Sequence, residues 1–457
     1  MWLLGYVLGA LVLASLPYWL PRAIVAVRIR IFTLINGESG VAIPGPLVSA
    51  AQFKRVYAHP AADGRSRGAK LSDLFWYWLA PGPELHQEHL EPGPRYQEVA
   101  KATRRILGVS KQAAEALTEE TVNRALDSLA IEQARSVRLR DLMLPIWAEF
   151  YYAIVFQRAC PAEARAHIVA HADDVVSALK CCRLRHMKRR HQLTGYLLEE
   201  LRTRGTPHTL PEALSQPEQA LYLQGTFFNT GVVQMSEAMT HLLLVIAEHP
   251  SIQARLRRED DPEYLDHVIN EVLRVYPLFG VSHRITSAAI AVDERVTLPA
   301  GSVLCFHHSD FHRHGFAEPE QLNPERWQHL SPRDACYIPF GVGGNRPCPA
   351  QAIALTSLRV AARIFLRRFR LASSARHDRS IPNAGPCLLV PREAPYSERR
   401  QRLALAWMRL ADRWQDVARS IVQLLLGTYM IWHARRLRLC ERYFAEQSSD
   451  ARKESWT

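Results

Sequence analysis

A single cysteine in a loop rich in glycine and proline is the feature that most constrains this 457-residue chain. Cys348 lies in the run Gly343-Gly344-Asn345-Arg346-Pro347-Cys348-Pro349-Ala350, and an apolar stretch with helical spacing follows it up to Ile364. The prolines fix the backbone, the glycines permit close approach of another group, and a helix N-terminus stabilises a thiolate. The loop therefore presents either a thiolate ligand for iron or a buried, inert cysteine, and both interpretations fit the loop alone.

Two charged motifs precede this loop. Glu271 and Arg274 are three residues apart, so one helix face carries both and they can pair. Arg326 follows in Pro324-Glu325-Arg326-Trp327 and offers a second guanidinium for the same carboxylate. An isolated pair of this kind is usually a solvated surface pair. The order of the three motifs, with the cysteine loop last, favours the iron-ligand interpretation.

With these motifs in this order, roughly residues 41 to 392 resemble the cytochrome P450 family. The resemblance implies a mostly α fold with a small β region and one heme b (iron protoporphyrin IX). It implies that Cys348 is the proximal iron ligand. It also implies that the two charged motifs form a buried triad that braces the core on the heme side: Glu271, Arg274 and Arg326.

Further heme contacts follow from the same resemblance. Arg346 and Arg284 correspond to arginines that contact the heme propionates. Arg104 or Arg105 is a weaker candidate, for which a solvated helix face is the preferred interpretation.

The cysteine loop departs from the family pattern at its start. Gly344 and Arg346 fall where the family has its glycine and arginine, counted back from Cys348. Phe340 lies eight residues before the cysteine, whereas the family has its phenylalanine seven residues before. The loop therefore carries one extra residue between Phe340 and Gly344. Ala350 replaces a glycine, which is a small change because both side chains lack bulk.

A second departure concerns residues 221 to 250, a long and largely apolar helix that resembles the family's distal helix. Counted back from its end, the family's box of small residue, Gly, any residue, acid and Thr falls on Thr230-Gly231-Val232-Val233-Gln234. Gly231 matches, but Val233 and Gln234 replace the acid and the alcohol that relay protons. Valine cannot relay a proton, and glutamine does not titrate. Either water and substrate deliver the protons, or the chain catalyses something other than O₂-driven hydroxylation.

The same helix supplies candidates for the pocket lining. They are Phe227, Phe228, Val232 and Val233, and plain helix core is the preferred interpretation for any one of them.

Both ends of the chain carry extra apolar segments. Residues 1–20 contain no charge and are long enough to span a bilayer, although Pro17 and Pro21 leave a shallow anchor open. The arginines that follow place the body of the protein in the cytoplasm. Residues 397 to 443 have helical spacing with an apolar face made by Leu403, Trp407, Leu410, Trp414, Val417, Ile421, Leu424 and Leu425. This helix packs on the body, lies at a membrane interface or docks a partner, and residues 445 to 457 are expected to form a polar, disordered tail.

The expected organisation is an N-terminal anchor (1–30), a heme-thiolate domain (41–392) and a C-terminal helical extension (393–457). The net charge of +12 is explained by membrane or redox-partner contacts better than by nucleic acid, for which no motif is visible. The leading hypothesis is a membrane-anchored monooxygenase for a lipophilic small molecule, with electrons from a separate reductase or ferredoxin. The alternatives are a heme-thiolate isomerase, dehydratase or peroxygenase that needs no external electrons, and a non-catalytic membrane scaffold.

Overall fold

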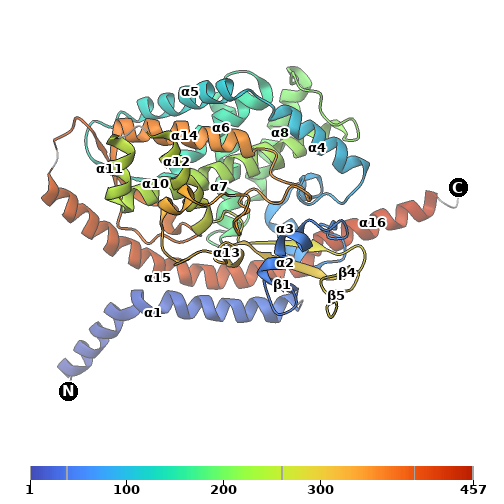
Figure 1. The fold of residues 1–457 in the computed structure, drawn as a ribbon, viewed down its shortest axis with the longest axis horizontal. Helices are drawn as coiled ribbons and strands as arrows, with labels where there is room; N and C mark the ends of the chain where they lie inside the picture. Colours follow the sequence, from blue (N-terminus) through green and yellow to red (C-terminus); the bar gives the residue numbers. More distant parts are fainter. Residues whose placement is uncertain (1, 38–39, 259–260, 396, 455–457) are drawn as a thin grey trace.

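The computed structural model describes residues 2–37, 40–258, 261–395 and 397–454 (Figure 1). Helices make up most of the chain and the strands are few and short, which confirms the predicted mostly α fold with a small β region. The α-helices are α1 (Trp2–Asn36), α2 (Ala50–Tyr57), α3 (Lys70–Leu79), α4 (Pro94–Ile106), α5 (Lys111–Leu129), α6 (Leu139–Phe156), α7 (Ala162–Leu179), α8 (Met187–Thr203), α9 (Gln216–Leu223), α10 (Val232–Glu248), α11 (Pro250–Arg258), α12 (Pro262–Val275), α13 (His308–Phe311), α14 (Gln351–Arg368), α15 (Glu398–Leu437) and α16 (Leu439–Glu454).

Three small sheets lie at the edges of this helical body. They are built from β1 (Val41–Ile43), β2 (Arg135–Arg138), β3 (Val281–Ile285), β4 (Ile290–Ala291), β5 (Thr297–Leu298), β6 (Val303–His307), β7 (Phe369–Ala372) and β8 (Pro386–Pro391). The first sheet has the order β1-β6-β3, with β1 parallel and β3 antiparallel to β6. The second has the order β2-β8-β7, and the third is the β4-β5 hairpin. Arg284 lies on β3, so the first sheet fixes its position relative to the helices.

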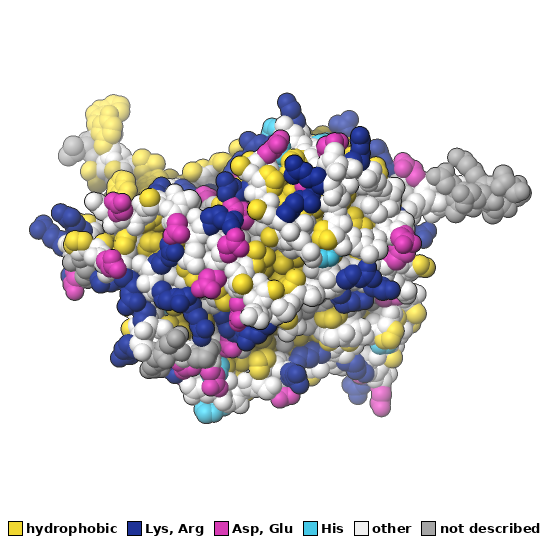
Figure 2. Space-filling model, turned by 90° about the horizontal axis from the view of Figure 1, so that it is seen from above, with side chains coloured by type: hydrophobic (Ala, Val, Ile, Leu, Met, Phe, Trp, Pro, Cys, Tyr) yellow, Lys and Arg dark blue, Asp and Glu magenta, His cyan; other side chains and the backbone are white. Residues whose placement is uncertain are grey.

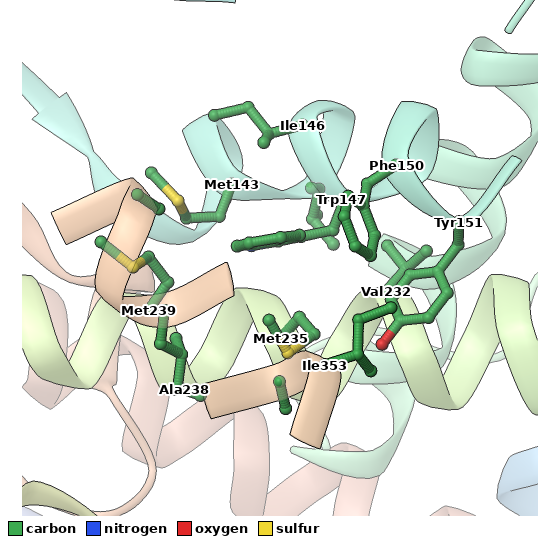
Figure 3. Packing of buried hydrophobic residues seen from close by; sticks show 14 of the residues in the cluster. Met143, Ile146, Trp147, Phe150, Tyr151, Val232, Met235, Ala238, Met239 and Ile353 are labelled. Carbon is green, nitrogen blue, oxygen red and sulfur yellow. The ribbon is translucent and has the colours of Figure 1, made fainter. Parts of the chain in front are cut away.

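One helix runs through the middle of the body from Gln216 to Glu248 and includes the π-helical segment η2 (Gln224–Gly231) between α9 and α10. Its α10 part is apolar on nearly every side, as expected for a helix that α6, α7, α12 and α14 surround (Figure 1). Figure 3 shows Trp147 and Phe150 of α6 packed against Met235 and Met239 of α10. This core holds the central helix rigidly beside the cysteine loop.

The triad residues lie on well-capped elements. Asp261 caps α12 by accepting hydrogen bonds from the N–H groups of Glu263 and Tyr264, and Pro262 occupies the first helical position, where its missing N–H costs nothing. The short 3-10 helix η3 (Pro324–Gln328) begins in the same way after Asn323. These caps position Glu271 and Arg274 on α12 opposite Arg326 on η3.

The two ends of the chain come together. α1 lies beside α15 along the base of the molecule, and the first part of α1 bends away from the body (Figure 1). Arg28 donates to Gln423 at 3.2 Å, and Arg413 donates to the Tyr18 hydroxyl at 2.9 Å. Among the described residues, two helices are long and apolar enough to cross a membrane, Gly5–Asn36 and Gln216–Glu248, but the second is mostly buried in the core.

The C-terminal extension differs from its prediction in two ways. The helix breaks at Arg438, which takes a left-handed φ of +48°, and a second helix then continues to Glu454. The expected disordered tail is therefore helical over 445–454, while residues 455–457 lie outside the described residues. Tyr443 and Phe444 pack against Trp76 and fix this helix to α3, which the polar composition of the tail does not reveal.

Candidate active site

The Cys348 loop has a tightly bonded backbone. The Cys348 N–H donates to the Phe340 carbonyl at 2.8 Å, and Arg346 takes a left-handed φ of +53°, which is rare for a residue with a side chain. Asn345 anchors the loop by donating to the carbonyls of Tyr57 and Ala62 at 2.7 and 2.8 Å. α14 begins at Gln351, three residues after the cysteine, as the apolar spacing predicts.

The thiol of Cys348 is partly exposed. Burial raises its pKa, the Ala350 N–H at the start of α14 opposes this shift, and the negative charge of Glu88 adds to it. The free thiol is therefore protonated at neutral pH, and a bound cation is what converts such a group into a thiolate.

Three arginines gather beside this loop, and two of them pair with one carboxylate. Arg284 and Arg65 lie 2.9 and 3.3 Å from Glu88, and Arg346 donates to the carbonyls of Gln87 and Leu90 at 3.1 and 2.7 Å. Partial burial alone would raise the pKa of Glu88, but Arg284 and Arg65 outweigh it and lower the pKa to about 2.

The cluster has more positive than negative charge. Glu88 pairs with Arg65 and Arg284 and Glu91 accepts the Arg65 backbone N–H, so two carboxylates lie among three guanidiniums. The Nε atoms of Arg65 and Arg284 are buried without a hydrogen-bond partner among the described residues. Burial lowers the pKa of Arg65 to about 9, and repulsion from Arg284 and Arg346 adds to that effect although Glu88 opposes it. Such a cluster fits an additional ligand with carboxylate groups.

One face of the central helix is less buried than the rest, and we call it the open face. Thr226, Thr230, Val233 and Gln234 are partly exposed, while the neighbouring Val232 and Met235 are buried. Their spacing of four, three and one residues places them on one side of the helix. The π-helical segment ends at Gly231, within this stretch, and π-helical turns are frequent at functional sites.

Side chains connect this face to the cysteine loop. The His86 Nε2 lies 2.6 Å from the Thr230 hydroxyl, and the Glu88 N–H donates to His86 Nδ1 at 3.3 Å. Burial lowers the pKa of His86 to about 4, so this imidazole is neutral at pH 7. Tyr151 of α6 covers Gly231, where a Cβ would lie 2.8 Å from the ring, and burial together with the charge of Cys348 raises the pKa of Tyr151. Cys348, Glu88 and Thr230 therefore belong to one site.

The predicted ion-pair triad is present as a bonded unit. Arg274 binds both oxygens of Glu271 at 2.8 Å, and Arg326 adds a contact at 3.1 Å. Trp327, which the sequence did not single out, donates its indole N–H to the same carboxylate at 2.9 Å. Glu271 is fully buried, and this network fixes α12 to the segment before the cysteine loop.

Several candidates have other surroundings. Arg104 and Arg105 are exposed on α4, as the preferred interpretation has it. Phe227, Phe228 and Val232 are buried in the helical core, which is also the simpler interpretation, so of the four suggested pocket residues only Val233 is on the open face. Gly344 faces Ala58 of the segment after α2, at a Cβ distance of 3.1 Å, and Phe340 is partly buried at the edge of the main core.

Comparison with known proteins now decides the family. The family model described as Cytochrome P450 matches residues 185–397, which include the central helix, the triad and the cysteine loop. The chain belongs to the cytochrome P450 family. Cytochrome P450 3A9 of Rattus norvegicus is 31% identical over 164 residues, which are 31% of this chain and 32% of that protein. Cyclooctat-9-en-7-ol 5-monooxygenase of Streptomyces melanosporofaciens is 26% identical over 166 residues, 32% of this chain and 36% of that protein. This P450 thus matches about a third of the length of these curated relatives.

Solved structures show the same fold. A six-coordinated cytochrome P450 from Thermus thermophilus superposes with a TM-score of 0.58 at 21% identity, over 74% of this chain and 91% of that chain. Membership of this family implies a heme cofactor. The donor set of this P450 fits such a group: a thiol on a rigid loop, an excess of guanidinium charge for carboxylates, and an open helix face beside them.

Arg65, His86, Glu88 and Tyr151 are site residues that sequence reasoning missed. Arg65 follows a glycine before α3, and His86-Gln87-Glu88-His89 is a cluster of polar side chains between two helices. The available signal for a site was the high density of titratable side chains at residues 86–89. Titratable side chains clustered between apolar helices often belong to a functional site.

Proposed function

We propose that this P450 is a heme-thiolate monooxygenase for a lipophilic small molecule, with heme b held by Cys348. The observation that carries the proposal is the arginine cluster beside the Cys348 loop, because its two unpartnered guanidinium nitrogens suit a ligand with two carboxylates. Heme bound through a thiolate supplies the chemistry that cleaves the O–O bond. Cys348 would be the iron ligand, and Arg65, Arg284 and Arg346 would bind the propionates.

The residues on the open helix face have the remaining roles. Gln234 and Thr230 can orient water by hydrogen bonding, and His86 holds the Thr230 hydroxyl in place. The Thr230 hydroxyl lies one helical turn before Gln234. Val233 and Gln234 themselves replace the family's acid–alcohol pair. Val233 contributes an apolar wall for a lipophilic substrate. Electrons would come from a separate reductase or ferredoxin, and α1 would anchor the protein with its body in the cytoplasm.

A second candidate function is favoured by Val233 and Gln234 themselves. Neither residue titrates, so this chain has no proton relay at these two positions. A heme-thiolate isomerase, dehydratase or peroxygenase does not need one, because it does not deliver protons to O₂.

The two functions are separated by restoring the missing pair. We expect the double variant Val233→Glu, Gln234→Thr, loaded with heme, to convert more of the supplied reductant into product than the unchanged chain. The measurement is the ratio of product to reductant consumed, with ¹⁸O₂ and a panel of lipophilic probes, and Thr226→Val serves as a control on the same face. A product that carries no ¹⁸O, and a ratio that the double variant leaves unchanged, would instead support the second candidate.

A further inference from the structure

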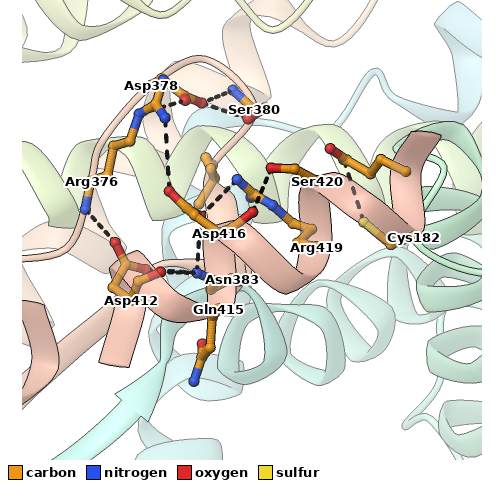
Figure 4. A network of polar contacts seen from close by, with 12 residues as sticks. Cys182, Arg376, Asp378, Ser380, Asn383, Asp412, Gln415, Asp416, Arg419 and Ser420 are labelled. Atoms are coloured by element: carbon orange, nitrogen blue, oxygen red, sulfur yellow. Dashed lines mark hydrogen bonds and ion pairs between the residues drawn. The ribbon is translucent and has the colours of Figure 1, made fainter. Parts of the chain in front are cut away.

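The helix α15 buries part of its polar surface and leaves many large apolar side chains exposed. The residues that face the body include Asp412, Asp416 and Ser420, which are only 2 to 5% exposed. They bind the segment before β8: the Arg376 N–H donates to Asp412 at 2.7 Å, and the Asn383 amide donates to the same carboxylate at 2.7 Å (Figure 4). The buried side of α15 therefore mixes these polar residues with apolar ones such as Met408, Met430 and Ile431.

The apolar face of α15 points away from the body. We call these residues the outer stripe, and they are Leu403, Trp407, Leu410, Trp414, Ile421, Leu425, Tyr429 and Trp432, each 42 to 70% exposed. They recur every three or four residues except between Trp414 and Ile421, which are seven apart, so the outer stripe follows one side of the helix for about 44 Å. Single exposed apolar residues are normal, but a continuous stripe of this length marks an interaction site.

The charges beside the outer stripe are basic. All residues of α15 are described, and they include eight arginines but only three acids, of which Asp412 and Asp416 are buried and Glu398 is exposed. Beyond the last residue of the outer stripe, Arg435, Arg436, Arg438 and Arg442 line a shallow hollow with Glu441. Tryptophan and tyrosine beside arginine suit the boundary between lipid acyl chains and anionic headgroups.

The outer stripe is continuous with another apolar surface. α1 lies along α15, with Val25, Ile29 and Phe32 facing Gly427 and Ile431 across a groove. Trp2, Tyr6, Leu8 and Leu11 of α1 are 55 to 85% exposed, so α1 also presents apolar surface to its surroundings. On the opposite face, Figure 2 shows basic side chains interspersed with acidic and apolar ones rather than a continuous apolar surface.

We propose that α15 is a second membrane element, which lies in the plane of an anionic bilayer with the outer stripe inserted among the lipids. α1 and α15 then hold the body against the membrane at two places instead of one. This role does not depend on the heme chemistry. A second copy of the chain bound to the same outer stripe is the competing occupant.

The test uses the full chain in vesicles of phosphatidylcholine with phosphatidylglycerol that carry a diazirine lipid. After illumination, mass spectrometry maps the lipid adducts. We expect adducts on peptides from both α1 and 403–432, and none on α5, which serves as an internal control. Adducts on α1 alone would overturn the proposal, and so would crosslinks between α15 peptides of two chains in place of lipid adducts.

Two neighbouring substitutions make the test specific to the outer stripe. Trp414→Glu places a carboxylate on the stripe, whereas Gln415→Glu places one about 100° away on the same exposed helix. We expect Trp414→Glu to abolish the α15 adducts and keep those on α1, and Gln415→Glu to keep both. Equal loss in the two variants, or equal adducts on α15 in vesicles without phosphatidylglycerol, would contradict an anionic lipid surface as the partner.

Discussion

Glu271 shows how a single residue joins distant segments. Its carboxylate is fully buried and accepts hydrogen bonds from Arg274, Arg326 and Trp327, so both of its oxygens are used. Two of these three partners could be predicted from the motif order, because arginine forks suit a shared carboxylate. The indole of Trp327 could not, because nothing in the spacing indicates which side chain completes the network.

We predict that Glu271→Gln destabilises the chain by about 3–5 kcal/mol, because two buried guanidiniums would lose their counter-charge. The free energy of unfolding in urea measures this effect. Glu320→Gln, at an exposed glutamate that pairs with Arg313, is the control and should change the value by less than about 1 kcal/mol. Equal effects of the two substitutions would contradict a role of the triad in the core.

Glu88 gives a pH dependence with a definite sign. Its pKa is about 2 in the folded chain and near 4.5 when unfolded, so its carboxylate stabilises the folded state above pH 4.5. This contribution is lost as the pH falls from about 4.5 towards 2.

We therefore predict that Glu88→Gln lowers the free energy of unfolding of the heme-free protein by about 1 kcal/mol at pH 6 to 7, a modest value because the carboxylate is partly exposed. The difference from the unchanged chain should shrink as the pH falls below 4.5. Chemical unfolding at pH 7, 5 and 3.5 measures it, with exposed Glu132→Gln as control. A difference that grows at low pH would refute the assigned sign.

At the scale of elements, the contact between α6 and the central helix limits what can stand at Gly231. The Tyr151 ring occupies the position where a side chain would begin, at 2.8 to 2.9 Å from an ideal Cβ. The resemblance assigns Gly231 to the family's box, but the glycine is also required here by a neighbour on another helix. Sequence spacing along one helix cannot show such a requirement, because the contact comes from α6.

We predict that Gly231→Ala destabilises the chain by about 1–3 kcal/mol through overpacking. Gly195→Ala on α8, where nothing lies within 4 Å of the added Cβ, should instead be neutral or stabilising by up to about 1 kcal/mol. Adding Tyr151→Leu should reduce the cost of Gly231→Ala, which a double-mutant cycle of unfolding free energies measures. Additive effects of the two substitutions would contradict the contact.

The long helices were well predicted because their apolar periodicity is local. The central helix was expected to begin at Leu221 and begins at Gln216, and the helix after the cysteine begins within a residue of its expected start. The π-helical turn and the direction in which α15 faces were not predictable. A periodic pattern defines an apolar face but does not say which side of the helix meets the body. In α15, buried Asp412 with its partners lies on the body side together with apolar residues such as Met430.

At the scale of the whole molecule, one rigid core supports two separate surfaces. The central helix, the triad network and the Cys348 loop form a continuous unit, while α1 and α15 form the base (Figure 1). The division into anchor, heme-thiolate domain and C-terminal extension stays a prediction. The packing of α15 against α1 and α3 shows that the extension is attached to the body rather than free.

The central claim is that Cys348 holds heme iron through its sulfur, and the absorption spectrum of the purified full chain, reduced and exposed to carbon monoxide, tests it most directly. The account predicts a strongly red-shifted Soret band for the unchanged chain and for Cys336→Ser, and loss of that band in Cys348→Ser. A band typical of histidine ligation in the unchanged chain, no heme band at all, or an unaltered band in Cys348→Ser would contradict the account.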